Sequence, residues 1–252
     1  MEPFQFLARD GLELHGYLSF PPGRGRVALP AVASVHGGPW TRDHWGFDPM
    51  TQFLATRGYL CIQVNYRGSA GYGSQHMNSG DREWGGPMHD DLVDAVRWCA
   101  RQDYVDPRRV AIFGVSYGGY AALVGAAFTP EVFRCAIAGV APVDEASTID
   151  SLPPYWLAAR ALFLHRVGDP GSDRELLWAR SPLSRAGQIS IPVLIAHGTN
   201  DARVPSGQAG ALDEAMRAGG ADPELLLFEN KATISSGSRS TARPSTPPPR
   251  DS

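Results

Sequence analysis

The sequence predicts an α/β domain with a mostly parallel, twisted sheet that carries helices on both faces. Apolar runs of strand length alternate with segments of helical periodicity along most of the 252 residues. Several of these runs end in glycine-rich turns, and a hydrophobic content of 43% is enough for a sizeable core. Functional residues are therefore expected in loops beyond the carboxyl ends of the strands.

The elements can be placed in order along the chain. Two alternating segments between Phe4 and Phe20 flank Arg9-Asp10-Gly11, which predicts a hairpin. Buried strands are expected at 31–35, 59–64, 110–115, 135–140, 193–196 and 224–228. Helices are expected at 49–56, 88–100, 117–127 and 206–218, and in 88–100 the apolar positions recur every three or four residues.

Composition excludes several classes of function. The chain has 23 Lys and Arg against 26 Asp and Glu, a net charge of −3, and no basic block, so no nucleic-acid partner is expected. Cys61, Cys99 and Cys135 are too widely spaced for a disulfide framework or a zinc knuckle, which favours a reducing, cytoplasmic compartment. Since no metal-ligand cluster or nucleotide-binding loop occurs, neither a cofactor nor a metal is expected.

The uncharged run 110–130 is 21 residues long and could by length alone cross a membrane. Its first part has the character of a strand, and Gly114, Gly118, Gly119 and Gly125 follow. A buried strand, a glycine turn and a small-residue helix explain this run better. Residues 1–9 show no signal-peptide pattern, so no membrane partner is expected.

A candidate nucleophile lies inside this run. Gly114-Val115-Ser116-Tyr117-Gly118 fits the pattern G-x-S-x-G, of which roughly 0.2 chance matches are expected in a chain of this composition. The pattern lies between a predicted strand and a predicted helix, where a strained turn would expose the Ser116 hydroxyl above the sheet. The alternative is a glycine-rich packing turn with an incidental serine.

Acyl transfer also needs hydrogen-bond donors for an oxyanion and a carboxylate to orient a base. The backbone N–H of Tyr117 is one donor, and a second is expected from His36-Gly37-Gly38-Pro39-Trp40, which could also be a simple turn. The acid should follow a later strand. Asp201 is the first choice, and Asp144, after the strand at 135–140, is the alternative.

With these residues the chain resembles the catalytic domain of the prolyl oligopeptidase family of serine peptidases, nearest its acylaminoacyl-peptidase and dipeptidyl-peptidase-like bacterial members. The matching segments are Asp10-Gly11 with Leu14 to Leu18, His36 to Pro39, Asn65 to Ser69 with Gly71 to Gly73, Gly114 to Tyr120, Pro153 to Trp156, Gly198 with Asn200-Asp201, and Arg203 to Pro205. The resemblance implies an α/β-hydrolase fold and a small peptide or acyl-amino-acid substrate. It also implies Ser116 as nucleophile, Asp201 as triad acid, and the N–H groups of Gly38 and Tyr117 as oxyanion hole. The oligomeric state is not indicated.

The sequence departs from this family in two ways. Members usually carry an amino-terminal β-propeller that restricts substrates, whereas this chain begins at the hydrolase domain, so either a propeller has been lost or the chain is a fragment. Members also place the catalytic histidine in a loop after the strand at 224–228, ahead of a closing helix. Here all seven histidines precede Asp201, although the order in this fold is serine, acid, histidine.

No other histidine is a good substitute for the missing base. His197 belongs to a strand end and should be oriented by packing, and His36 is expected to brace the oxyanion loop through hydrogen bonds. His165 lies in a Leu-rich segment, expected to be helical, without an assigned partner.

Composition changes abruptly after Asn230. Residues 231–252 hold six Ser and four Pro with few apolar side chains, so we expect a disordered tail after a hydrolase domain at 1–230. Lys231-Ala232-Thr233-Ile234-Ser235 can be encoded as AAG GCC ACG ATA TCG. One G restored after the first codon would give Lys-Gly-His-Asp-Ile, with histidine at position 233. The hypothesis is that a single-nucleotide deletion replaced the histidine loop and closing helix with an out-of-frame tail.

The predicted function is that of a serine peptidase which, as written, is inactive or nearly so and poorly soluble. Without the histidine, Ser116 remains a weak alcohol, and a sheet face that the closing helix covers in the family would be exposed. A carboxylesterase is the alternative within the hydrolases. A non-catalytic hydrolase-fold binding module is the alternative from another class.

Overall fold

The computed structural model describes residues 1–231 and 242–244. These residues form a nine-stranded sheet of order β1-β2-β4-β3-β5-β6-β7-β8-β9. The strands are β1 Glu2–Leu7, β2 Glu13–Ser19, β3 Leu29–Val35, β4 Leu60–Asn65, β5 Val105–Val115, β6 Cys135–Gly139, β7 Val193–Gly198, β8 Glu224–Phe228 and β9 Ala242–Pro244. Strands β3 to β8 are parallel, and β1, β2 and β9 are antiparallel to their neighbours. The predicted hairpin and mostly parallel sheet are confirmed.

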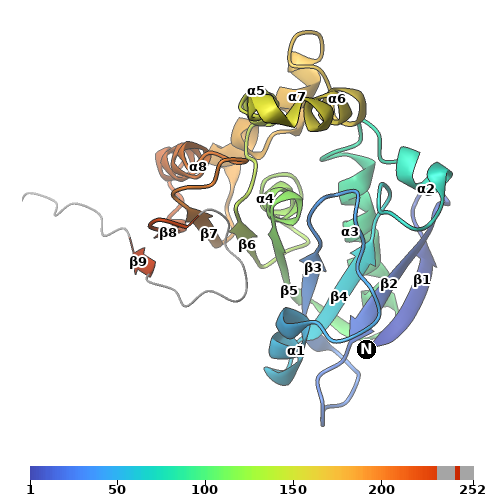
Figure 1. Cartoon of the computed structure of the whole chain (residues 1–252). Helices are drawn as coiled ribbons and strands as arrows, with labels where there is room; N and C mark the ends of the chain where they lie inside the picture. Colours follow the sequence, from blue (N-terminus) through green and yellow to red (C-terminus); the bar gives the residue numbers. More distant parts are fainter. Residues whose placement is uncertain (232–241, 245–252) are drawn as a thin grey trace, which may run out of the picture.

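Helices connect the strands of the sheet. The helices are α1 Pro49–Thr56, α2 Ser74–Asn78, α3 Pro87–Arg101, α4 Tyr117–Phe128, α5 Glu145–Asp150, α6 Leu157–Arg166, α7 Arg174–Arg180 and α8 Gly207–Ala218, with 3-10 turns at Pro154–Trp156 and Pro182–Gln188. In Figure 1, α5, α6 and α7 lie together at the top of the view, far from α1 at the bottom. Sequence reasoning did not predict α2, α5, α7 or the two 3-10 turns as elements.

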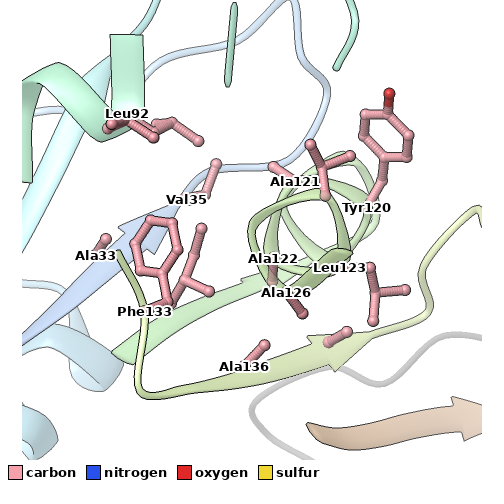
Figure 2. Close-up of a cluster of buried hydrophobic side chains, with 14 of the residues drawn as sticks. Ala33, Val35, Leu92, Tyr120, Ala121, Ala122, Leu123, Ala126, Phe133 and Ala136 are labelled. Carbon is pink, nitrogen blue, oxygen red and sulfur yellow. The ribbon is translucent and has the colours of Figure 1, made fainter. Parts of the chain in front are cut away.

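The main core lies between the sheet and helices α3, α4 and α8. Every residue of α4 from Tyr117 to Ala127 is buried, and Figure 2 shows its alanines and Leu123 among side chains from the neighbouring strands. Helix α1 covers the other face, where the Cys61 thiol of β4 donates to the Thr51 carbonyl of α1 at 3.7 Å. Helices on both faces of the sheet are therefore confirmed.

The second face of the sheet is covered less completely than the first. Phe113, Ile137 and Leu194 lie in register on β5, β6 and β7 and are half-buried, whereas the alternate residues Ile112, Ala136 and Val193 are buried. Alternate side chains of a strand point to opposite faces. The half-buried row therefore lies on the face away from α4, where the sequence leads us to expect missing cover.

The run 110–130 forms the end of β5, the turn at Ser116 and the whole of α4, so the interpretation as strand, glycine turn and helix is confirmed. In the described part of the chain, no helix combines the length and apolar character that crossing a membrane requires. Of the segment 231–252, only Lys231 and β9 fall within the described residues, and β9 pairs antiparallel with β8. The disorder expected for the rest of that segment concerns residues outside the described ones.

Candidate active site

Ser116 occupies a strained turn between β5 and α4. Its backbone angles are φ 60° and ψ −121°, a conformation that residues with a side chain rarely adopt. Two hydrogen bonds hold the turn: the Ser116 N–H donates to the Gly139 carbonyl at 2.8 Å, and the Tyr120 N–H donates to the Ser116 carbonyl at 3.0 Å. The half-buried serine thus sits at the carboxyl end of β5, as the G-x-S-x-G pattern predicts.

The glycines on either side of Ser116 are required by close backbone contacts. A Cβ on Gly114 would lie 2.4 Å from the Gly118 carbonyl carbon, and a Cβ on Gly118 would lie 2.1 Å from the Val35 carbonyl oxygen. Both distances are far below any real carbon contact. A side chain at either position would collide with backbone, so the turn that carries Ser116 requires both glycines.

The loop after β3 lies against this turn. A Cβ on Gly37 would be 3.1 Å from the Val115 carbonyl oxygen and 3.7 Å from the Ser116 Cβ. Gly38 has φ +116°, which favours glycine, and a Cβ there would lie 2.9 Å from the Trp40 nitrogen. The loop after β3 and the Ser116 turn, which are far apart in the sequence, are therefore in contact, as an oxyanion site formed by both requires.

His36 braces this loop, as expected. Its Nε2 is hydrogen-bonded to the Ser69 hydroxyl at 3.0 Å, and its ring stacks on Tyr66 with centroids 4.3 Å apart. The Tyr66 hydroxyl donates to the His36 carbonyl at 2.9 Å. Burial lowers the pKa of His36 to about 4, so the imidazole is neutral at physiological pH.

Asp201 lies in the loop after β7, at the same edge of the sheet as Ser116. It is 7% exposed, and its Oδ1 accepts backbone N–H groups from Arg203 at 2.8 Å and from Val204 at 3.0 Å. These bonds fix the carboxylate in its turn. The alternative acid, Asp144, caps α5 by accepting the Ser147 N–H at 3.2 Å, which gives its carboxylate a structural task.

The histidines of this chain make contacts elsewhere. His197 is buried, and its Nε2 is hydrogen-bonded to the Val204 carbonyl at 2.8 Å; burial lowers its pKa despite nearby Asp201. His165 lies on α6, as expected, with an exposed ring whose Nε2 is 3.9 Å from the Asp81 carboxylate. Within the described residues no histidine is hydrogen-bonded to Ser116.

A buried ion pair stabilises the chain segment that holds His36. Both oxygens of the Asp91 carboxylate accept from the Arg67 guanidinium, with Nη2 to Oδ1 at 2.7 Å and Nε to Oδ2 at 2.9 Å. Arg67 also pairs with Asp10 at 2.7 Å. This network joins the hairpin turn and α3 to the segment Asn65 to Ser69, whose last residue holds His36.

Glu145 is a buried acid that sequence reasoning missed. It begins α5, is 3% exposed, and its N–H donates to the Ser181 hydroxyl at 2.9 Å. Its Oε1 has no hydrogen-bond partner among the described residues. Burial raises the pKa of Glu145 to about 8, an effect that the neighbouring Tyr120 hydroxyl and Arg180 oppose. Glutamate so near a helix start is ordinarily solvated, so the residue pattern carries no signal of this burial.

Known proteins are similar to this chain in sequence. Residues 45–242 match the prolyl oligopeptidase family. Dipeptidyl aminopeptidase BIII of Pseudoxanthomonas mexicana is 41% identical over 238 residues, which are 91% of this chain and 34% of that protein. The human acylamino-acid-releasing enzyme is 29% identical over 217 residues, 82% of this chain and 29% of its own. The chain thus spans about a third of the length of the curated relatives it matches.

A solved structure agrees with these sequence relatives. The puromycin-hydrolysing peptidase of Mycobacterium tuberculosis superposes with a TM-score of 0.85 at 28% identity, over 92% of this chain and 36% of that one. The strand order, the strained backbone at Ser116 and the family match all agree with an α/β-hydrolase of this family. The chain belongs to the prolyl oligopeptidase family of serine peptidases, and its fold is that of an α/β-hydrolase.

Proposed function

We propose that this chain carries the catalytic part of a serine peptidase that acts on short peptides or acyl-amino acids, with Ser116 as its nucleophile. The observation that carries the proposal is the strained backbone of Ser116 with Gly37 packed against it. The relatives include a dipeptidyl aminopeptidase and an acylamino-acid-releasing enzyme, which supports a peptidase over a carboxylesterase.

The proposed reaction begins with attack of the Ser116 Oγ on a substrate carbonyl. The N–H groups of Tyr117 and Gly38 donate to the oxyanion of the tetrahedral intermediate. A histidine takes the serine proton and passes it to the leaving amine, and Asp201 orients that histidine. Water then hydrolyses the acyl-enzyme by the same route in reverse.

The histidine is the missing part of this scheme. The sequence has none after Asp201, and the described histidines are engaged elsewhere. We therefore propose that residues 1–230 are the hydrolase domain and that 231–252 are read out of frame. Loss of a triad member can cost ~10⁶ in turnover and leave ~10³–10⁴ over water. The chain as written should be nearly inactive.

Two measurements test this proposal. Resequencing the DNA across codons 231–235 tests the reading frame, and a codon choice incompatible with histidine at 233 would contradict it. In a frame-corrected protein, cleavage of an acyl-amino-acid anilide should exceed that of a matched p-nitrophenyl ester relative to the uncatalysed rates. Ser116→Ala should abolish both activities, and faster relative ester cleavage would favour the carboxylesterase.

The absent histidine also supports a second candidate, a non-catalytic hydrolase-fold binding module. Such a module would bind a peptide at this edge of the sheet without a burst of product. A resequenced gene that confirms Lys231-Ala232-Thr233, combined with saturable peptide binding, would favour it. In either case we propose a reducing, cytoplasmic location, which the three free cysteines support.

A further inference from the structure

Four arginines surround a cavity at the edge of the sheet opposite Ser116. Arg24 lies between β2 and β3, Arg57 follows α1, Arg109 is in β5, and Arg134 precedes β6. Although they come from four separate segments, all four line one cavity of about 390 Å³. This volume is within the range of roughly 300–1,000 Å³ that small-molecule sites occupy.

The positive charge of this cavity is only partly compensated. Arg109 pairs with Asp106, Nε to Oδ2 at 3.0 Å, and the Arg57 guanidinium lies 4.6 Å from the centre of the Phe53 ring. Arg24 and Arg134 form no ion pair with a carboxylate of the described residues. None of the described residues that line the cavity is acidic, although the whole chain carries a net charge of −3.

Apolar residues, which we call the apolar floor, form part of the cavity lining. They include Pro30 in β3, Tyr59 immediately before β4 and Ala111 in β5, and Tyr59 is 39% exposed. Planar guanidinium groups pair with phosphate oxygens through two parallel hydrogen bonds. We propose that this cavity binds a phosphate-bearing organic anion, with the phosphate held by the arginines and the apolar part resting on Tyr59 and Pro30.

The cavity contains its own reporter. Cys135 lines it and is half-buried, whereas the two other cysteines, Cys61 and Cys99, are 0% exposed. A small neutral thiol reagent should therefore modify Cys135 first. An anion bound between the arginines would cover this thiol and slow the reaction.

The test measures the rate at which iodoacetamide alkylates Cys135 in the full chain at low ionic strength. Mass spectrometry quantifies the alkylated protein. Phenyl phosphate should slow alkylation saturably by at least about fivefold, at lower concentrations than inorganic phosphate because it adds the apolar contact. Arg24→Gln and Arg134→Gln should each raise the half-saturating concentration by about two- to fivefold, the range for exposed charge pairs. Arg97→Gln, an exposed arginine on α3, should leave it unchanged.

Protection is expressed, within each variant, as the ratio of the alkylation rates without and with the anion. This ratio is needed because burial raises the pKa of the Cys135 thiol and the Arg134 charge opposes that rise, so Arg134→Gln changes the thiol's own reactivity. All three substitutions are at exposed positions, and circular dichroism checks that each variant folds. Absence of protection, equal protection in the two cavity variants and the parent, or equal slowing by neutral phenol would each overturn the proposal. Equal potency of phenyl phosphate and inorganic phosphate would overturn the assignment of the apolar floor.

Discussion

Gly118 and the Val35 carbonyl oxygen are in such close contact that a Cβ on Gly118 would lie 2.1 Å from that oxygen. Gly118 follows the nucleophile turn at Ser116, and Val35 ends the strand that leads into the His-Gly-Gly loop. The contact therefore holds the Ser116 turn and the His-Gly-Gly loop together through backbone alone. No side-chain movement can relieve a clash at this position.

Gly118→Ala should lower the free energy of unfolding by about 1–3 kcal/mol, the usual cost of overpacking. The matched control is Gly210→Ala in α8, where a Cβ would meet nothing within 4 Å. That control should be neutral or stabilising by up to about 1 kcal/mol through helix propensity. Urea unfolding of both variants measures the difference, and equal effects would show that this backbone contact is not present in solution.

Removing one partner of the buried Arg67–Asp91 pair should be strongly destabilising. Asp91→Ala leaves the Arg67 guanidinium, 7% exposed, with Asp10 as its one remaining carboxylate partner among the described residues, and such losses cost about 3–5 kcal/mol. Asp90→Ala, on the same helix, removes a pair in which both side chains are more than a third exposed and should cost no more than about 1 kcal/mol. Thermal denaturation distinguishes them, and a similar loss in both would contradict the buried network.

Glu145 should make the protein less stable as pH rises. Its folded pKa of about 8 lies above the ordinary value of 4.5, so the folded state retains a proton that the unfolded chain releases. The free energy of unfolding should therefore fall by up to about 1.4 kcal/mol per pH unit from this group between pH 4.5 and 8, and no further above pH 8.

Glu145→Gln isolates this contribution from other buried groups such as His89, whose pKa burial lowers to about 4. The variant should lose the Glu145 slope and exceed the parent in stability at pH 8. Glu131→Gln, at an exposed position, should keep the parental slope. Denaturant titrations at pH 5, 6, 7 and 8 make the comparison, and parallel curves for parent and Glu145→Gln would refute the burial of this carboxyl.

The sequence predicts most of the sheet and the serine turn because local signals specify them. Helix α1 begins at Pro49 and ends at Thr56, as predicted, since a proline suits the first helical turn and Asp48 caps it through the Thr51 N–H. The turn at Ser116 is equally local, because the two glycines and the preceding apolar strand lie within a dozen residues.

The region from α5 to α7 could not be predicted because distant contacts stabilise it. Helix α5 is only six residues long and is held by the Ser181 hydroxyl, and Arg166 at the end of α6 pairs with Asp81 at 2.6 Å. Neither partner is near in sequence. The sequence predicts that His36 braces the loop through hydrogen bonds, but nothing in the residue pattern identifies Ser69 as its partner.

We propose that Ser116 is an activatable nucleophile that lacks its base. The rate of Ser116 labelling by a fluorophosphonate, located by mass spectrometry, tests it most directly when the chain as written is compared with the frame-corrected chain. We expect labelling of the chain as written to stay near that of its Ser116→Ala variant, and the corrected chain to react at least about 10³-fold faster at Ser116. Rapid, stoichiometric labelling of the chain as written, or labelling of the corrected chain at another residue, would contradict the claim.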